Sequence, residues 1–162
     1  MNFDALQAAF DADPQGAAYH ELVTGYVSAG RMVDALIVAQ QAVQYRPQDI
    51  AARRLMGWVM LTQNQIRPAM QAFADALQQS PGDSESRFLY GLCLERLNET
   101  DQAKVQLGYV LQSVPNHPGA LEALKRLDAG EEPPPPREDK TVMMSLEDVV
   151  SSKTYTGSFP GD

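Results

Sequence analysis

The sequence has few of the residues on which most catalytic and metal-binding sites depend. It contains one cysteine and two histidines, and His20 and His117 lie far apart in the chain. Zinc sites need cysteine and histidine in closely spaced pairs, and no glycine-rich phosphate-binding loop follows a strand-like segment. We therefore expect no enzyme, no metal and no cofactor. Activity that disappears on mutation of His20 alone would be the sign of an enzyme.

Long hydrophobic runs are also missing, although 44% of the residues are hydrophobic. No segment reaches the roughly 18 apolar residues of a transmembrane helix, and Met1 to Asp4 lack the features of a signal peptide. A single cysteine, Cys93, permits no internal disulfide. Its neighbours Leu92 and Leu94 indicate a buried, unreactive thiol. These absences predict a cytoplasmic protein without a membrane segment.

Positive charge is scarce as well. Thirteen Lys and Arg residues stand against 21 Asp and Glu residues, which gives a formal net charge of −8. Nucleic-acid-binding domains carry a basic patch or stripe. The composition therefore excludes nucleic acid and favours a protein or peptide partner.

What the sequence does contain is a repeat with a period of 34 residues. An alanine and a proline recur in register, without insertion, as Ala35 and Pro47, Ala69 and Pro81, and Ala103 and Pro115. Further columns align on these anchors, such as Tyr19, Arg53 and Arg87, or Ala39, Phe73 and Leu107. A period of this length with a closing proline is typical of stacked helical hairpins.

These residues resemble the tetratricopeptide repeat over roughly residues 16 to 117. The resemblance implies an all-α, right-handed α-solenoid of three helix–turn–helix units, with an N-terminal half-unit and a C-terminal capping helix, followed by an extended tail. The expected domain spans 1–130, with a leading helix at 2–12, repeats at 16–49, 50–83 and 84–117, and the capping helix at 118–128. An acidic polyproline linker follows at 131–136.

The turns and helix starts have their own signals. Gly30, Asn64 and Asn98 lie at the turn inside each repeat, where a positive φ angle is expected. Asp49 and Asp83 are expected as N-caps of the helices that follow them. The last helix is expected to present a polar outer face that includes Glu122, Lys125, Arg126 and Asp128.

The tail at 137–162 is expected to be disordered unless it is docked, because it has too few apolar residues to fold alone. Its apolar residues form a candidate ligand segment: Val142, Met143, Met144, Leu146, Val149 and Val150. Acids flank them, and we expect the tail to dock in a tetratricopeptide groove, either that of its own chain or that of a neighbour. Pro133 to Pro136 form a stiff spacer, which favours the groove of a neighbour and hence a homo-oligomer by tail exchange.

Thr141 has the exposed context of a possible phosphorylation site, with an unmodified threonine as the alternative. A phosphate there would add nearly two negative charges.

The resemblance also implies a concave groove lined by the first helix of each repeat. Carrying over the inward positions gives the candidate peptide-binding residues His20, Thr24, Val27, Arg54, Trp58, Leu61, Phe88, Leu92 and Arg96. Trp58 and Phe88 lie off the columns that pack the repeats, so they are expected as aromatic anchors. Packing between helices is the alternative for Trp58, Leu61, Phe88 and Leu92. Arg54 and Arg96, helped by Arg53 and Arg87, are expected to favour an acidic ligand.

Together these patterns predict a non-enzymatic adaptor or scaffold that binds an apolar, acidic peptide in its concave groove and self-associates through its own tail. The alternative is a small secretion-type chaperone that holds an export client unfolded. Co-purification of a disordered client, instead of a self-complex, would favour the chaperone.

Overall fold

The structure is a computed structural model that describes residues 1–143. This part of the chain contains eight long helices and no strand. The helices are α1 (Phe3–Ala12), α2 (Ala18–Ser28), α3 (Met32–Tyr45), α4 (Ile50–Thr62), α5 (Ile66–Gln79), α6 (Ser84–Arg96), α7 (Thr100–Ser113) and α8 (Pro118–Asp128). One further helical turn lies at 140–143.

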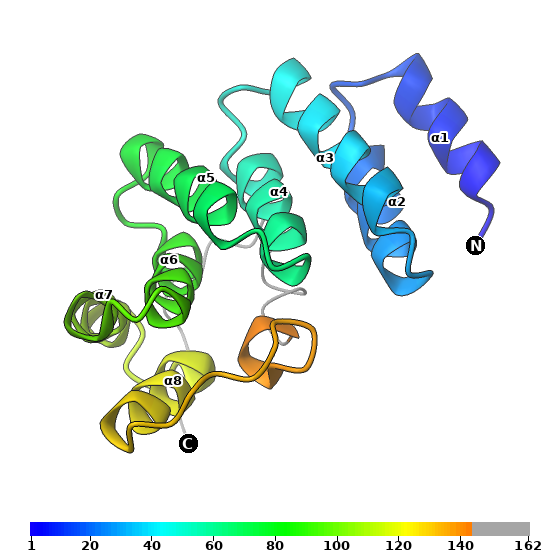
Figure 1. Cartoon of the computed structure of the whole chain (residues 1–162). Helices are drawn as coiled ribbons and strands as arrows, with labels where there is room; N and C mark the ends of the chain where they lie inside the picture. Colours follow the sequence, from blue (N-terminus) through cyan, green and yellow to red (C-terminus); the bar gives the residue numbers. More distant parts are fainter. Residues whose placement is uncertain (144–162) are drawn as a thin grey trace, which may run out of the picture.

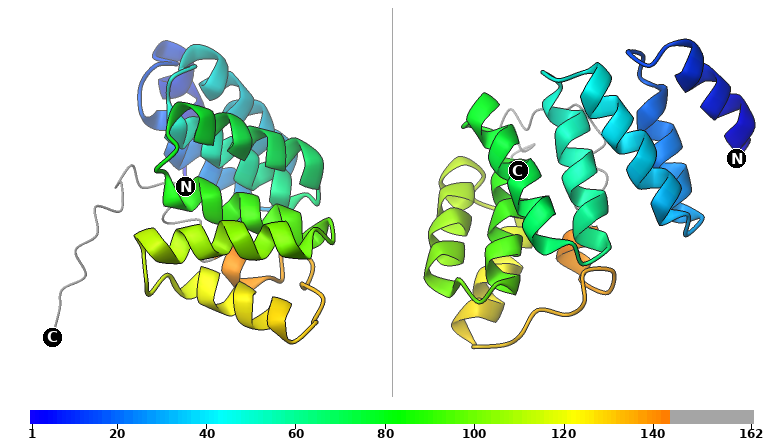
Figure 2. Two further views of the ribbon diagram at one scale, coloured as in Figure 1. Left: turned by 90° about the vertical axis from the view of Figure 1, so that its left-hand side faces the viewer. Right: turned by 45° about the horizontal axis from the view of Figure 1, so that its top comes forward.

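The helices are stacked as consecutive antiparallel hairpins along a curved path (Figure 1). The pairs α2 and α3, α4 and α5, and α6 and α7 follow one another, with α1 beside α2 and with α8 beside α6 and α7. Helices α2, α4, α6 and α8 lie on the inner side of the curve, and α3, α5 and α7 lie on the outer side (Figures 1 and 2). The predicted all-α solenoid is confirmed.

Small residues allow the two helices of a hairpin to approach closely. A Cβ atom added at Gly57 in α4 would lie 2.7 Å from Cε1 of Phe73 in α5. At Gly91 in α6, the same atom would lie 3.1 Å from Cδ2 of Leu107 in α7. Facing alanines such as Ala69 and Ala103 are fully buried. The repeated small residues therefore set the spacing within the hairpins α4–α5 and α6–α7.

The turns inside the repeats have the conformation that their sequences predict. Gly30 has φ of 73°, and Asn64 and Asn98 both have φ of 60°. Asparagine tolerates this left-handed region better than most residues with a side chain. The same turn is therefore made three times, by glycine once and by asparagine twice.

The predicted N-caps are confirmed, and they also join successive inner helices. Asp49 accepts a hydrogen bond from the backbone nitrogen of Ala52 (3.2 Å), and its other oxygen accepts one from the Tyr19 hydroxyl of α2 (2.9 Å). Asp83 caps α6 through the nitrogen of Ser86 (3.2 Å) and accepts from Nη1 of Arg54 in α4 (2.8 Å). Each cap thus links its helix to the preceding inner helix.

Helix α1 covers the first end of the stack. At the first end, the Phe3 ring of α1 stacks on Tyr26 of α2 with 4.9 Å between centroids, and Phe10 is 2% exposed.

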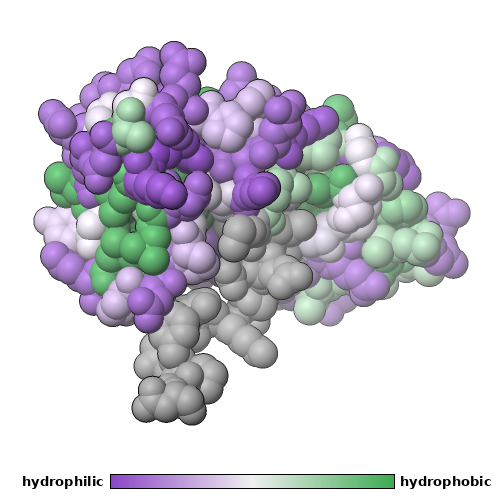
Figure 3. All heavy atoms as spheres, turned by 90° about the horizontal axis from the view of Figure 1, so that it is seen from below, coloured by the Kyte–Doolittle hydropathy of each residue, from purple (hydrophilic) through white to green (hydrophobic). Residues whose placement is uncertain are grey.

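Viewed from below, the described surface is largely hydrophilic, with hydrophobic patches toward both ends of the molecule (Figure 3). No helix within residues 1–143 combines the length and the apolar character needed to cross a membrane.

Candidate functional site: the inner groove and residues 137–143

The inner side of the solenoid receives a later part of the chain. After α8 the backbone passes through Pro133 to Pro136 and turns back toward α4 and α6 (orange in Figure 1). The carbonyl of Pro135 accepts hydrogen bonds from the nitrogens of Glu138 (2.8 Å) and Asp139 (3.0 Å), which closes this turn. A helical turn follows at 140–143. We refer to residues 137–143 as the docked segment.

The apolar contact of the docked segment is made through Val142. Its side chain is fully buried and belongs to the same hydrophobic core as the solenoid helices. Its carbonyl oxygen accepts a hydrogen bond of 2.9 Å from Nε1 of Trp58 in α4. Trp58, the only tryptophan in the chain, is also fully buried. A buried indole N–H needs an acceptor, and the docked segment supplies it.

The polar contact is a cluster of four charged side chains, Glu95, Arg96, Arg126 and Asp139, which we call the charge cluster. Nη2 of Arg96 lies 2.5 Å from Oδ2 of Asp139, and Nη2 of Arg126 lies 3.3 Å from the same oxygen. Arg126 also binds Glu95 through two hydrogen bonds of 2.6 and 2.8 Å. Asp139 and Glu95 are only 1% and 3% exposed. Two positive and two negative groups thus balance in a buried site.

The surroundings of Asp139 keep it ionised. Burial alone would raise its pKa, but the hydrogen bond from Thr141 and the guanidinium groups of Arg96 and Arg126 outweigh burial and lower the pKa. The Thr141 hydroxyl donates to Oδ1 of Asp139 (2.6 Å), and so does the Thr141 backbone nitrogen (2.9 Å). The hydrogen bonds with Glu95 raise the pKa of Arg126. Asp139 and Arg126 are therefore both charged in the docked state.

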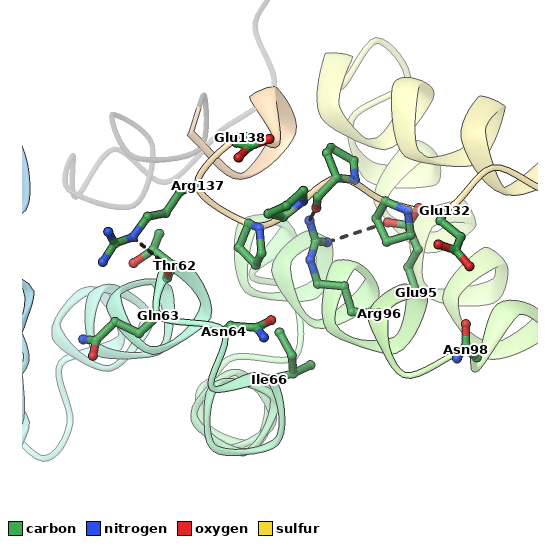
Figure 4. A pocket seen from close by; sticks show the side chains of 14 residues that line it. Thr62, Gln63, Asn64, Ile66, Glu95, Arg96, Asn98, Glu132, Arg137 and Glu138 are labelled. Carbon is green, nitrogen blue, oxygen red and sulfur yellow. Dashed lines mark hydrogen bonds and ion pairs between the residues drawn. The ribbon is translucent and has the colours of Figure 1, made fainter.

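Further contacts hold the ends of the proline run (Figure 4). Nη2 of Arg96 donates to the carbonyl of Pro134 (3.2 Å), and Nε of Arg137 donates to the carbonyl of Thr62 at the end of α4 (3.2 Å). A pocket of about 920 Å³ remains beside the prolines, lined by residues such as Thr62, Ile66 and Arg96. The docked segment is thus bound to α4, α6 and α8.

The three predicted groove residues of α2 lie outside this contact. His20, Thr24 and Val27 are half-buried, and no hydrogen bond joins them to residues 137–143. The His20 ring packs on Tyr19 with 4.0 Å between centroids. Burial, followed by the nearby Arg46 and Arg54, lowers the pKa of His20 despite Asp49. A neutral imidazole follows.

Phe88 of α6 packs against the start of α8, as the alternative of packing between helices predicts. Its ring is 4.5 Å from that of His117, and a Cβ atom at Gly119 would lie 2.5 Å from its Cζ. Leu61 and Leu92 are fully buried in the same core as Trp58. Of the two predicted anchors, Trp58 is the one hydrogen-bonded to the docked segment.

The expectation that Arg53 and Arg87 add positive charge to the groove is wrong. Nη2 of each donates to the carbonyl of the repeat-closing proline, Pro47 or Pro81, at 2.9 Å. Arg87 also donates to Gln106 of α7 (2.7 Å). These arginines, in the repeat column that holds Tyr19 in the first unit, brace the preceding turn. Arg54 binds the Asp83 cap, and Arg96 binds the docked segment.

The expectation that Arg126 lies on the polar outer face of the last helix is wrong, because the residue is 8% exposed and faces Glu95 and Asp139. The repeat itself carries the signal that would have found it. Trp58, Leu92 and Arg126 are spaced by the 34-residue period. Continuing that column into α8 places Arg126 on the inner wall.

Two expectations about the tail also differ from the structure. Thr141 is 3% exposed, because its hydroxyl is turned toward Asp139. The stiff spacer favoured a neighbouring groove, but the turn at Pro135 returns the docked segment to the groove of its own chain. Met143 is 38% exposed. The remaining residues of the predicted ligand segment, Met144, Leu146, Val149 and Val150, lie outside the described residues.

Reactive and metal-binding groups are not part of this site. The predicted burial of Cys93 is confirmed, and burial raises the pKa of its thiol to about 12. Within residues 1–143, no group of three His, Cys, Asp or Glu side chains could hold a metal ion. The arrangement is suited to holding a polypeptide by backbone, apolar and carboxylate contacts.

Comparison with known proteins supports this interpretation of the fold. Residues 29–126 match the family described as anaphase-promoting complex, cyclosome, subunit 3. No curated protein matches the sequence. Among solved structures, YrrB, described as a TPR protein with an unusual peptide-binding site, is 21% identical with a TM-score of 0.65, over 91% of this chain and 74% of its own. MamA is 17% identical with a TM-score of 0.66, over 91% and 84%.

Proposed function

We propose that this chain, which belongs to the family described as anaphase-promoting complex, cyclosome, subunit 3, is a non-enzymatic adaptor. The family match and the structural neighbours identify the chain as a tetratricopeptide repeat protein. Its ligand is an apolar, acidic segment of a partner protein, bound in the concave groove. Residues 137–143 of the chain itself occupy that groove until a partner segment replaces them. A structural neighbour with a described peptide-binding site supports peptide binding by this fold.

The observation that carries the proposal is the chemistry of the docked segment. Its backbone accepts a hydrogen bond from Trp58, its Val142 side chain is buried, and its Asp139 side chain binds Arg96. A backbone acceptor, an apolar side chain and a carboxylate are features that many peptides can supply. The groove is therefore equipped to bind such a segment from another protein.

The tether gives the docked segment an advantage over any free partner. A segment on a short linker has an effective concentration of about 1 mM. A partner present at about 10 µM must therefore bind the open groove roughly 100-fold more tightly than the docked segment does to occupy half of it. The docked segment would thus act as a threshold that admits strong ligands and rejects weak ones.

Self-association is the second candidate, and the same contacts favour it. If the docked segment of one copy enters the groove of another copy, every contact seen within the chain is reproduced between chains, as in domain swapping. The mass of the full chain, measured by light scattering over a range of concentrations, tests this exchange. A mass that stays at 17.8 kDa at every concentration excludes it.

The adaptor proposal is tested with a peptide of residues 134–143 that carries a fluorescent label. The receptor is the full chain with Val142→Asp. Burying a carboxylate without a partner in an apolar site is costly, so the docked segment should leave the groove of this variant. We expect the peptide to bind this receptor and to bind the wild-type chain much more weakly. The matched control is Lys140→Ala, since Lys140 is exposed within the docked segment.

Circular dichroism of each variant would verify that the helices are intact. Adding Arg96→Glu to the Val142→Asp receptor should abolish binding, because the peptide carboxylate then faces a carboxylate. A peptide that binds neither receptor nor wild type at millimolar concentration refutes the proposal. Co-purification of a disordered client that binds independently of Trp58 and Arg96 would support the chaperone alternative instead.

A further inference from the structure

We infer that the groove selects its partner by a motif of three positions: an aspartate that begins a helical turn, a threonine or serine two residues later, and an apolar residue directly after that. In this chain the motif consists of Asp139, Thr141 and Val142. The inference rests on the proposed function and specifies the partner: a protein segment that carries Asp-x-Thr/Ser followed directly by an apolar residue and can form one turn of helix.

The first position requires an aspartate because its carboxylate is used on two sides. Oδ1 accepts from the Thr141 backbone nitrogen at the start of the turn, while Oδ2 faces the two arginines. Aspartate is a strong N-cap residue, and glutamate places its carboxylate one carbon farther from the backbone. Asparagine preserves the cap but removes the negative charge. The position therefore selects both the length and the charge of the side chain.

The charge cluster explains why an acid is needed. Without Asp139, the buried groups Arg96, Arg126 and Glu95 leave one positive charge in excess. Burying an unbalanced charge is costly, whereas a paired and hydrogen-bonded one is tolerated. A ligand that brings one carboxylate restores the balance, and a neutral or basic ligand does not.

The second and third positions fix the register. Thr141 is 3% exposed and its hydroxyl donates to Asp139, so a serine can replace it, whereas a valine loses this hydrogen bond. Val142 follows the aspartate by three residues, which in a helical turn places both on one side. Moving the apolar side chain by one residue would rotate it by roughly 100° away from the core. Lys140 is exposed, so the position between the aspartate and the threonine of the motif is free to vary.

The experiment uses the full chain with Asp139→Lys as receptor, because a lysine beside Arg96 and Arg126 expels the docked segment and leaves the helices unchanged. The Val142→Asp chain is a second, independent receptor. The probes are labelled peptides of residues 134–143: wild type, Asp139→Asn, Asp139→Glu, Thr141→Val, and one in which Thr141 and Val142 are exchanged. A Lys140→Ala peptide is the matched control. Fluorescence anisotropy gives each Kd, and Trp58 emission reports binding in the groove.

We expect the Asp139→Asn and exchanged peptides to bind at least about 10-fold more weakly than wild type, with smaller losses for Asp139→Glu and Thr141→Val, and the control to stay within about twofold. Equal affinities for the wild-type, Asp139→Asn and exchanged peptides would overturn the motif while leaving the adaptor proposal intact. No binding of the wild-type peptide to either receptor would overturn the adaptor proposal itself.

Discussion

Replacing Asp139 by asparagine should release the docked segment without disturbing the solenoid. The substitution keeps the size of the side chain and an oxygen that can accept from Thr141, so the start of the helical turn is preserved. It removes the negative charge that binds Arg96 at 2.5 Å and Arg126 at 3.3 Å. The helices that form the groove keep their own contacts, including the pair between Arg126 and Glu95.

The size of the effect follows from these two contacts. A hydrogen bond to a charged group contributes about 1.5–3 kcal/mol, and the longer distance from Arg126 makes its share the smaller one. A total of about 3 kcal/mol corresponds to a roughly 100-fold change in the equilibrium between docked and released segment. The loss cannot exceed the docking free energy itself, because the segment can leave the groove.

Hydrogen exchange of the Trp58 indole N–H measures this equilibrium directly. The proton is held by the carbonyl of Val142, and a chain with one tryptophan gives one indole signal in a nitrogen-correlated NMR spectrum. Its exchange should accelerate roughly 100-fold in Asp139→Asn and stay close to wild type in Lys140→Ala. An Asp139→Asn rate within about threefold of wild type would refute the reasoning.

Three further predictions use the same structure. Gly57→Ala should destabilise the chain by about 1–3 kcal/mol, because the new methyl group would lie 2.7 Å from Phe73. Gly108→Ala is the control, since its methyl group would meet nothing within 4 Å. A thermal unfolding midpoint of Gly57→Ala as high as that of the wild type would contradict the prediction. Thr141→Glu should speed exchange of the Trp58 indole by placing a second acid beside Asp139, whereas Thr141→Ser should not. Acid should also release the segment: the docked site lowers the pKa of Asp139 below its ordinary 3.8, so docking is stabilised above that value and loses this contribution as the pH falls toward the docked pKa. Trp58 emission should then change below pH 3.8 in wild type, and an equal change in Asp139→Asn would contradict it.

The sequence predicts the solenoid well because its determinants are local and are repeated. Gly30, Asn64 and Asn98 each specify a turn through their own backbone preference, and Asp49 and Asp83 each cap the helix next to them. Such signals act within a few residues. Seeing them three times in register compensates for the weakness of each.

The site is harder to predict because its contacts join distant parts of the chain. The tail was expected to find a groove, and its acidic and apolar composition supported that expectation. Its destination depended instead on a turn at Pro135 and on a pairing between Asp139 and Arg126. Neither follows from composition. Stiffness of the proline run was a misleading guide, since one turn after it reverses the direction of the chain.

The repeat column that contains Trp58, Leu92 and Arg126 also gives the groove a direction. The same inner-wall position changes from an indole in α4 to a leucine in α6 and a guanidinium in α8. A helical turn whose aspartate precedes its apolar residue therefore binds with its amino-terminal end at Arg126 and with its carbonyl groups toward Trp58, as residues 139–142 do. The reversed orientation would place the acid beside the indole and the apolar side chain beside the buried arginines. The carboxylate and the arginines would then be separated from their charged partners. A partner segment should for this reason enter at the α8 end and continue toward α4.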